Sequence, residues 1–489
     1  MANSTLLSRR AFLAASSATA LALPAAAKTA LRPIRSTPSE VAWRELARRM
    51  RGPVLRPWDP DFYALNQPDN LRYAGTIPQG MARCTVAEDV ATAIGWSREN
   101  DIALITRSGG HSYAGYSTTT GLMIDMRLLN HVSPGGDVVN VAGGAINESI
   151  YEKLTEMNAT ITHGRCPSVG AAAFLLGGGI GFNMREMGLA CDQVASTDLV
   201  TADGTMLRLT ANETDPDKQK LFWACQGGGG GNFGISTAFT LKVTPVPKTL
   251  TVFKIGWRND PFKVAVLLTQ ALAKAPVTFG SRISFSAGKD IRVNLLGQLK
   301  GTTDELMAIL KDVPPSDDNG TIIREMSYWD GQDFLAEPAR PTYYQERSAF
   351  VNEELSVKAL ETGFQHLKLW PGTHDYCDLR FFQTGGAVND KKPGDTAFVH
   401  RKSKWLMVVG LYWTAEDNRN ADLMRRNHTW QNDFYQAMLP YAGGGAYQNF
   451  PDPSLVDWRL SYYGENFFRL ADAKKDVDPT RVFNFAQAI

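Results

Sequence analysis

Residues 107–115 read RSGGHSYAG and residues 164–170 read GRCPSVG, and these two stretches decide what kind of protein the chain encodes. Two glycines precede His111, so little side-chain bulk surrounds the imidazole ring and a ligand can contact it directly. A histidine in an exposed turn would show the same local pattern. Cys166 also lies between two glycines, although an isolated cysteine is usually a small buried apolar residue. Together the two motifs favour a ligand-binding site over either structural alternative.

Two more glycine clusters point in the same direction: GGGIG at 177–181 and GGGGGN at 227–232. Backbone N–H groups of such loops can bind a pyrophosphate at close range, whereas tight turns at a sheet edge explain many single clusters. Neither cluster continues into the Gly-Lys-Ser/Thr of a Walker loop. Neither is a clean Gly-x-Gly-x-x-Gly between a strand and a helix, which disfavours a nicotinamide Rossmann site. Several glycine-rich segments in one region therefore indicate a large phosphate-bearing cofactor.

The composition is typical of a globular protein with a large core. The chain has 489 residues, of which 44% are apolar and 21% are charged, and these fractions exclude long disordered or fibrous segments. At about 150 residues per domain, this length predicts roughly three units or two large ones. Lys and Arg total 51 and Asp and Glu total 50, giving a net charge of +1. We expect no nucleic-acid partner, because no overall basic field is available.

The N-terminus has the features of an export signal. Arg9 and Arg10 precede a moderately apolar run, AFLAASSATALALPAAA at 11–27, which ends in small residues. This pattern predicts a twin-arginine signal peptide over residues 1–27. A membrane anchor is the alternative, but the run is short for a span of about 20 residues and polar side chains interrupt it. We expect a periplasmic or secreted protein that has no stable membrane insertion once the signal is removed.

A protein-ligated metal site is not expected. The seven histidines are scattered, and neither a Cys-x-x-Cys pair nor a His-Glu-x-x-His motif occurs. An odd number of cysteines in an exported protein leaves at least one thiol unpaired. The five cysteines are Cys84, Cys166, Cys191, Cys225 and Cys377.

The pattern of apolar runs, glycine turns and helical stretches changes along the chain, which divides it into segments and predicts an α+β protein. Residues 28–61 contain an amphipathic helix over 38–51. Residues 62–246 alternate short apolar runs, glycine turns and helical stretches. Residues 247–445 contain strand-like runs with two or three helices, which predicts antiparallel strands with helices on one face. Residues 446–489 form an aromatic-rich tail that ends in a short helix and a turn.

The ordered motifs resemble a known family. RSGGHSYAG is followed by GRCPSVG and LLGGGIG, then LFWACQGGGGGNFGI, then YYGENFFRLADAKKDVDPTRVF. In this order they are similar to the berberine-bridge-enzyme-like flavin oxidases of the vanillyl-alcohol-oxidase/p-cresol-methylhydroxylase superfamily. The resemblance covers the chain from about residue 70 to 487. It implies a two-domain FAD-binding fold, in which 62–246 and the tail 446–489 bind FAD and 247–445 form an antiparallel-sheet substrate domain.

The resemblance also implies how the cofactor is held. In this family the histidine of the first motif bonds to the 8α-methyl group of FAD and the cysteine of the second bonds to a nearby ring carbon. His111 and Cys166 match, so bicovalently attached FAD is expected. The third residue after the cysteine, here Val169, lies where oxygen approaches the flavin, and valine there accompanies oxidases. The other expected cofactor-binding residues are Arg107, Ser108, Gly109, Gly110, Ser112, Gly170, Gly178, Gly179, Asn232, Tyr463 and Asn466.

Several positions that are polar in other family members are apolar here. They are Phe174, Ile180, Val408 or Val409, and Phe450. These replacements predict a more apolar site than a sugar oxidase needs.

The remaining candidates for the catalytic base are Tyr113, Tyr447 and Asp378. Alternation along a strand places Asp378 and Arg380 on one face, where the arginine could orient an ionised carboxylate. A purely structural salt bridge is the alternative.

The resulting hypothesis is an exported FAD-dependent oxidase. It would take a hydride from a small-molecule alcohol, a sugar hemiacetal or a related secondary metabolite, and it would reduce molecular oxygen to hydrogen peroxide. One alternative is a dehydrogenase of the same fold that passes electrons to a quinone or a protein. Another is a catalytically degenerate protein that binds flavin or carbohydrate.

Overall fold

A computed structural model describes residues 36–287 and 290–489, which belong to one compact unit. The predicted signal peptide, residues 1–27, lies outside the described residues. Among the described helices, none combines the length and apolar character that crossing a membrane requires.

The first half of the unit is built on two small sheets. The first has the strand order β1-β2-β4-β3, with β2 and β3 both parallel to β4. Its N-terminal helix α2 packs on α4, and Trp43 and Leu46 of α2 are buried there. The bounds are α2 Glu40–Arg49, β1 Val54–Leu55, α3 Phe62–Asn66, β2 Gly80–Arg83, α4 Ala87–Glu99, β3 Leu104–Arg107 and β4 Leu122–Asp125.

The second sheet of this half is antiparallel, with the order β5-β6-β10-β8-β9. A separate two-stranded pair, β7 and β11, closes the segment. The bounds are β5 Val132–Pro134, β6 Val138–Ala142, α5 Asn147–Glu156, β7 Ala159–Thr160, α6 Ala171–Leu176, α7 Met184–Met187, β8 Val194–Val200, β9 Met206–Thr210, α8 Pro216–Ala224, β10 Ile235–Lys242 and β11 Thr244–Pro245.

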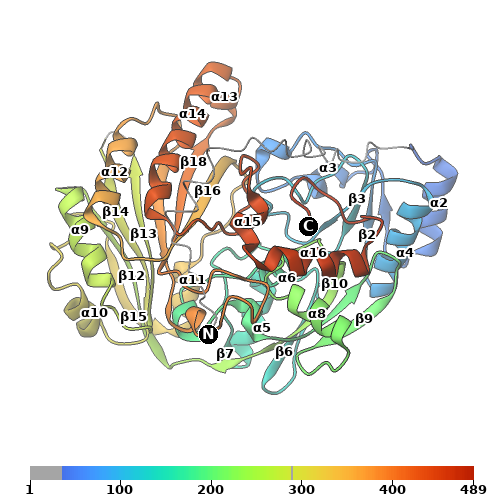
Figure 1. Ribbon diagram of the computed structural model, residues 1–489, viewed down its shortest axis with the longest axis horizontal. Coiled ribbons are helices and arrows are strands. Elements are labelled where there is room, and N and C mark those ends of the chain that lie inside the picture. The colour runs from blue at the N-terminus through green and yellow to red at the C-terminus, as the bar shows by residue number, and fades with distance from the viewer. Residues whose placement is uncertain (1–35, 288–289) are drawn as a thin grey trace, which may run out of the picture. The chain divides into compact units, whose positions relative to one another are not determined.

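The second half is one seven-stranded antiparallel sheet with the order β15-β12-β14-β13-β17-β18-β16. Helices α9, α12 and α14 cover one face of it (Figure 1). The bounds are β12 Thr249–Trp257, α9 Pro261–Leu272, β13 Phe279–Ala287, β14 Arg292–Leu299, α10 Thr303–Ile309, β15 Ile322–Ser327, α11 Tyr328–Leu335, β16 Tyr343–Val351, α12 Val357–Lys368, β17 Cys377–Gln383, β18 Trp405–Trp413, α13 Ala415–Asn418 and α14 Ala421–Met438.

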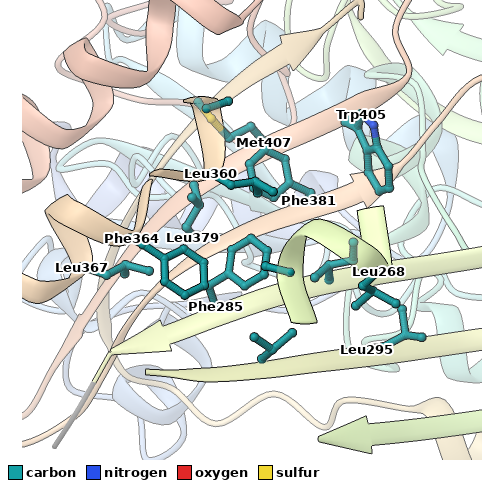
Figure 2. Close-up of a cluster of buried hydrophobic side chains, with 14 of the residues drawn as sticks. Leu268, Phe285, Leu295, Leu360, Phe364, Leu367, Leu379, Phe381, Trp405 and Met407 are labelled. Atoms are coloured by element: carbon teal, nitrogen blue, oxygen red, sulfur yellow. The ribbon is translucent and has the colours of Figure 1, made fainter. Parts of the chain in front are cut away.

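The helix-covered face of this sheet holds the largest apolar core, part of which Figure 2 shows. Phe285 of β13 contacts Phe364 of α12 with ring centroids 5.2 Å apart, and Phe381 of β17 at 6.1 Å. Side chains alternate across a strand, so the residues flanking these phenylalanines point to the opposite face. That opposite face is therefore free to form a site.

The C-terminal segment returns to the first half of the unit through α15 (Trp458–Tyr463) and α16 (Asn466–Val477). Helix α16 packs against α8, and the buried Lys474 of α16 donates a hydrogen bond to the backbone oxygen of Asn232. The Lys474 ammonium is also 2.7 Å from Asp478. The hydrogen bond from Lys474 therefore joins the tail to the second glycine cluster.

The α+β class and the antiparallel sheet with helices on one face are confirmed. The boundary predicted near residue 246 falls between β11 and β12, where the chain leaves the small sheets for the large one. In the second half, four elements were not predicted from sequence: strands β15 and β16 and helices α11 and α12. Strand β16 reads YYQERSAFV, and its run of polar residues hides a strand that is buried from Tyr344 to Val351.

Candidate functional site

A cavity of about 1200 Å³ lies between the polar face of the large sheet and the glycine-rich loops of the first half. Its walls include both sequence motifs, the second glycine cluster, strands β13, β17 and β18, and the C-terminal tail. Residues from Asp69 to Gln487 therefore contribute to the cavity wall. Among the described residues, no group of three or more His, Cys, Asp and Glu could hold a metal ion.

His111 and Cys166 line the cavity and both contact the side chain of Ser168. Nε2 of His111 is 3.0 Å from the Ser168 hydroxyl oxygen, and Sγ of Cys166 is 3.5 Å from the same oxygen. On the other side of the ring, Nδ1 of His111 is 3.5 Å from the carboxylate of Asp69. Burial raises the pKa of the Cys166 thiol, so this thiol is protonated at neutral pH. The geometry brings two nucleophilic side chains to one ligand position.

The two loops that carry these residues touch through glycines. A Cβ atom on Gly109 would lie 2.3 Å from the backbone nitrogen of Gly170 and 2.6 Å from the backbone oxygen of Ser168. A Cβ on Gly170 would meet the Gly109 nitrogen at 2.3 Å in return. Any side chain at either position would push the loops apart. The glycines of the two motifs are thus required by a close backbone contact.

The second glycine cluster is suited to a phosphate-bearing ligand. Gly229, Gly230, Gly231 and Asn232 all line the cavity. Gly229 and Gly231 have φ angles of +85° and +75°, which side-chain-bearing residues rarely adopt. A Cβ on Gly229 would lie 3.0 Å from the hydroxyl of Tyr463, another lining residue. The backbone is therefore exposed to the cavity where side chains would fill it, as a pyrophosphate site requires.

Most of the expected cofactor residues line the cavity, and four do not. The lining ones are Ser108, Gly109, Gly110, His111, Ser112, Cys166, Val169, Gly170, Asn232 and Tyr463. The other four, Arg107, Gly178, Gly179 and Asn466, contact neighbouring protein groups. Arg107 is buried and donates hydrogen bonds to the backbone oxygens of residues 65, 66 and 117. Asn466 donates to the backbone oxygens of residues 393, 396 and 397.

Gly178 and Gly179 serve packing behind the cavity wall. A Cβ on Gly178 would lie 3.0 Å from the Phe398 ring, and one on Gly179 would lie 2.6 Å from Ala190. The N–H of Gly179 donates to the hydroxyl of Tyr447 at 2.9 Å. Their sequence pattern cannot be told from that of a phosphate loop, because both uses need glycine.

On the opposite wall, three neighbouring strands place two carboxylates in one rung of the sheet. Gly410 of β18 pairs with Asp378 of β17 on one side and with Glu346 of β16 on the other. Paired residues project to the same face, so both acids point into the cavity wall. A Cβ on Gly410 would lie 2.4 Å from Oδ1 of Asp378. The missing side chain of Gly410 is what makes room for the acidic groups.

Arg380 lies between the two carboxylates. Its Nε is 3.0 Å from Oδ2 of Asp378, and its Nη2 pairs with Oε1 of Glu346. The same Nη2 donates to the hydroxyl of Tyr412 at 2.6 Å, and that hydroxyl in turn contacts Glu346. The predicted contact between Asp378 and Arg380 therefore forms. Glu346 was missed, because strand β16 was not recognised; its period-two spacing with Tyr344 and Ser348 is the signal that could have found it.

The electrostatic surroundings make Asp378 a stronger base than an ordinary aspartate. Burial, opposed by Arg380 and reinforced by Glu346, raises the pKa of Asp378 to about 6. Oδ1 of Asp378 has no hydrogen-bond partner among the described residues. This oxygen is itself buried and is therefore an unsatisfied acceptor, and the carboxylate has a proton affinity close to neutral pH.

The two tyrosine candidates occupy different surroundings. The ring of Tyr113 stacks on Phe450 with centroids 4.8 Å apart and meets Tyr344 edge-on at 5.1 Å. Burial raises the pKa of Tyr113 well above its usual value. The Tyr447 hydroxyl accepts a hydrogen bond from Asn449 at 3.1 Å, and burial also raises its pKa. Both phenols are protonated at neutral pH, so Asp378 is the better acceptor of a proton.

The cavity is apolar only on one side. Phe174, Ile180 and Phe450 line it as the sequence predicted, and Val408 lies in the apolar cluster around Tyr447. Val409 points to the opposite, helix-covered core. The expectation of an apolar site is wrong for the sheet wall, because alternate residues of β12, β13 and β14 bring polar groups to it. These are Lys254, Arg282, Ser284, Ser286 and Asn294.

Two family models match the chain. One described as "FAD binding domain" matches residues 78–210, and one described as "Berberine and berberine like" matches residues 446–489. The FAD-linked oxidoreductase YgaK of Bacillus subtilis is 30% identical over 453 residues, covering 90% of this chain and 97% of YgaK. The berberine bridge enzyme-like protein D-2 of Nicotiana tabacum is 28% identical and covers 86% of this chain and 84% of its own length.

Solved structures share the fold. The berberine bridge enzyme-like protein 1 of Physcomitrella patens superimposes with a TM-score of 0.82 at 24% identity, covering 91% of this chain and 98% of its own. Berberine bridge enzyme from Eschscholzia californica gives a TM-score of 0.82 at 23% identity, covering 92% and 98%. A variant of Phl p 4 named a glucose dehydrogenase gives 0.78 at 23% identity, covering 89% and 96%. The predicted fold class is therefore confirmed.

Substituting Gly109 by alanine should impair cofactor loading. The added Cβ would overlap the backbone of residues 168 and 170 and would displace the two loops from each other. We expect a clear loss of flavin absorbance per chain in purified Gly109→Ala and a lower melting temperature. Gly75→Ala is the matched control, since no described atom lies within 4 Å of its Cβ position. Full flavin content in Gly109→Ala would contradict the role of this contact.

Proposed function

The chain belongs to the berberine-bridge-enzyme-like family of FAD-linked oxidoreductases, and from this premise we propose that it is an exported oxidase acting on hydroxyl-bearing small molecules. One observation carries the proposal. His111 and Cys166 converge on one side of the cavity, and Asp378 lines it from the sheet wall with an unpartnered oxygen. The first pair can attach a cofactor, and the aspartate can accept a proton.

The residues of the glycine-rich wall would hold FAD. The proposal assigns attachment to His111 and Cys166, and the pyrophosphate region to Gly229, Gly231 and Asn232. Bound FAD supplies hydride acceptance and a route for the two electrons to oxygen. The fit is supported by backbone that is open to the cavity at these glycines and by the shared serine contact of the two attachment residues.

Asp378 would take the hydroxyl proton of the substrate. Its Oδ1 is unpartnered, while Oδ2 lies against Arg380, which fixes the carboxylate plane. As the O–H proton moves to Asp378, the C–H hydrogen leaves with its electron pair, so the alcohol carbon becomes a carbonyl carbon. Two protons and two electrons then leave the substrate, the number that reduces one oxygen molecule to one hydrogen peroxide. Tyr113 borders the same space and could donate a hydrogen bond to the substrate oxygen.

The polar sheet wall supports a substrate with several hydrogen-bonding groups. Ser284, Ser286 and Asn294 offer hydroxyl and amide groups to the cavity. Sugar hemiacetals and polyhydroxylated secondary metabolites have several such groups, whereas a simple alcohol has one. A protein that binds flavin or carbohydrate without catalysis is less well supported. The buried charges of Asp378, Glu346 and Arg380 beside the cavity cost stability, and a catalytic function gives a reason to retain them.

The proposal that the protein is exported is supported by its sequence. The paired arginines and the apolar run at 1–27 support twin-arginine export to the periplasm or the medium. That route carries folded proteins, which agrees with a chain that loads its cofactor before leaving the cytoplasm.

The flavin should remain on the chain after denaturation. The yellow chromophore should survive acid precipitation, and the intact mass should exceed that of the apo chain by one FAD. His111→Ala and Cys166→Ala should each keep one bond, and the double variant should release the flavin. Cys84→Ala, which removes a buried thiol that does not line the cavity, should behave as wild type. Complete release of flavin from wild type by acid would refute covalent attachment.

Replacing Asp378 should remove the base. Asp378→Asn should lower kcat by roughly 10²–10⁴-fold, the usual effect of losing a general base, without releasing the flavin. Because the base must be ionised, wild-type kcat/KM should rise with pH and level off above about 6. Asp422→Asn, at an exposed ion pair, serves as the control. Near-wild-type turnover in Asp378→Asn would move the role to Tyr113 or Tyr447.

Oxygen should be the electron acceptor, and Val169 should control its access. Val169 lines the cavity beside Cys166, and one added methylene in a packed wall can fill a space of the size of dioxygen. We expect fast reoxidation in air, one peroxide per substrate, and slow reoxidation in Val169→Leu with substrate reduction preserved. Val277→Leu is the control, because it adds the same methylene at an exposed position and should leave reoxidation unchanged. A reduced wild type that stays bleached in air but recovers with a quinone would establish the dehydrogenase alternative.

A further inference from the structure

Two carboxylates compete for one guanidinium in the wall of the cavity. Arg380 contacts Glu346 through Nη2 and Asp378 through Nε, so neither acid has the arginine to itself. Each acid keeps one buried oxygen without a hydrogen-bond partner among the described residues, Oδ1 of Asp378 and Oε2 of Glu346. The two acids differ at the other oxygen: Oε1 of Glu346 contacts both Arg380 and the Tyr412 hydroxyl, whereas Oδ2 of Asp378 contacts Arg380.

The competition is built into the strand register. Glu346, Gly410 and Asp378 occupy one rung, and Arg380 lies two residues along β17 on the same face. Since Gly410 has no side chain, the guanidinium can reach across β18 to the glutamate; a Cβ there would lie 2.9 Å from Nη2 of Arg380. An alanine in place of Gly410 would block this crossing. The glutamate is therefore an integral partner of the Asp378–Arg380 pair.

The other charged groups around Asp378 are largely paired with one another. Arg282 of β13 lies 2.9 Å from Glu337, and Arg165 lies 2.7 Å from the same carboxylate. This group carries two positive charges and one negative charge, and Glu346 acts on Asp378 more strongly than Glu337 does. The titratable and charged groups that interact with Asp378 are Arg380, Glu346, Arg282, Glu337, Tyr412, Tyr376 and Cys377.

We propose that Glu346 is a positioning residue that draws Arg380 partly away from Asp378 and thereby makes Asp378 an effective proton acceptor near neutral pH. A carboxylate fully paired with arginine is a weak base, since the pair must be disrupted before a proton can bind. Sharing the arginine weakens that pairing while keeping Asp378 oriented. This inference rests on the proposed role of Asp378 and names what tunes it.

The test is an infrared pH titration of the purified holoenzyme, which requires no substrate. The C=O stretch of protonated Asp378 is identified as the band that is absent from Asp378→Asn. In wild type it should titrate with a midpoint near pH 6. In Glu346→Gln the freed arginine should pair fully with Asp378, and the midpoint should fall by about one pH unit or more, in the range that one nearby charge produces. The acidic limb of kcat/KM should move the same way.

Two further variants make the outcome decisive. Glu346→Asp retains the charge on a shorter side chain, so its midpoint should lie between those of wild type and Glu346→Gln. Glu354→Gln neutralises a half-exposed glutamate paired with Lys404, just after the same strand, and should leave the midpoint unchanged. An unchanged or raised midpoint in Glu346→Gln would overturn the inference. High turnover in Asp378→Asn would instead overturn the role of Asp378 as base. The effect of Glu346 on the titration midpoint of Asp378 is measured independently of that result.

Discussion

The alternation of side chains along strand β17 is the constraint on which the site depends. The strand reads CDLRFFQ, and its odd members Leu379 and Phe381 enter the helix-covered core while Asp378 and Arg380 face the cavity. A shift of register by one residue would exchange the two faces, burying charges among phenylalanines. The apolar packing of Phe285, Phe364 and Phe381 therefore fixes the position of the acidic group as firmly as any contact inside the cavity (Figure 2).

The opposite wall depends on a different constraint, the contact of two backbones. The attachment loops approach so closely at Gly109 and Gly170 that neither can carry a side chain. This contact sets His111 and Cys166 around Ser168, with distances of 3.0 and 3.5 Å to its hydroxyl oxygen. The two walls are thus positioned independently, one by core packing and one by glycine backbone, and the reactive space lies between them.

The sequence predicted the glycine-rich wall better than the sheet wall, for physical reasons. Motifs around His111 and Cys166 are local, since a few consecutive residues specify a loop that must be free of side chains. The acidic cluster is assembled from three strands, so only Asp378 and Arg380, which share a strand, could be paired in advance. Glu346 comes from a strand whose polar residues conceal its burial. Asp69 follows no motif and reaches His111 only through tertiary contact. Gly178 and Gly179 show the converse ambiguity, since packing and phosphate binding require the same residue.

The energetics of Asp378 connect the two faces of the sheet. Its pKa is raised from 3.8 to about 6, which corresponds to roughly 3 kcal/mol of free energy favouring the protonated form in the folded state. For an acid with a raised pKa, this contribution to stability is complete below pH 3.8 and is lost as the pH rises through 6. At neutral pH the folded protein therefore carries an ionised aspartate at a cost that the rest of the molecule must offset. Burying one large apolar side chain such as Phe285 contributes about 1.5–3 kcal/mol, so the core directly behind β17 is of the right size to do so. Strand β17 thus supplies both the proton acceptor and, through Leu379 and Phe381, part of the packing that offsets its cost.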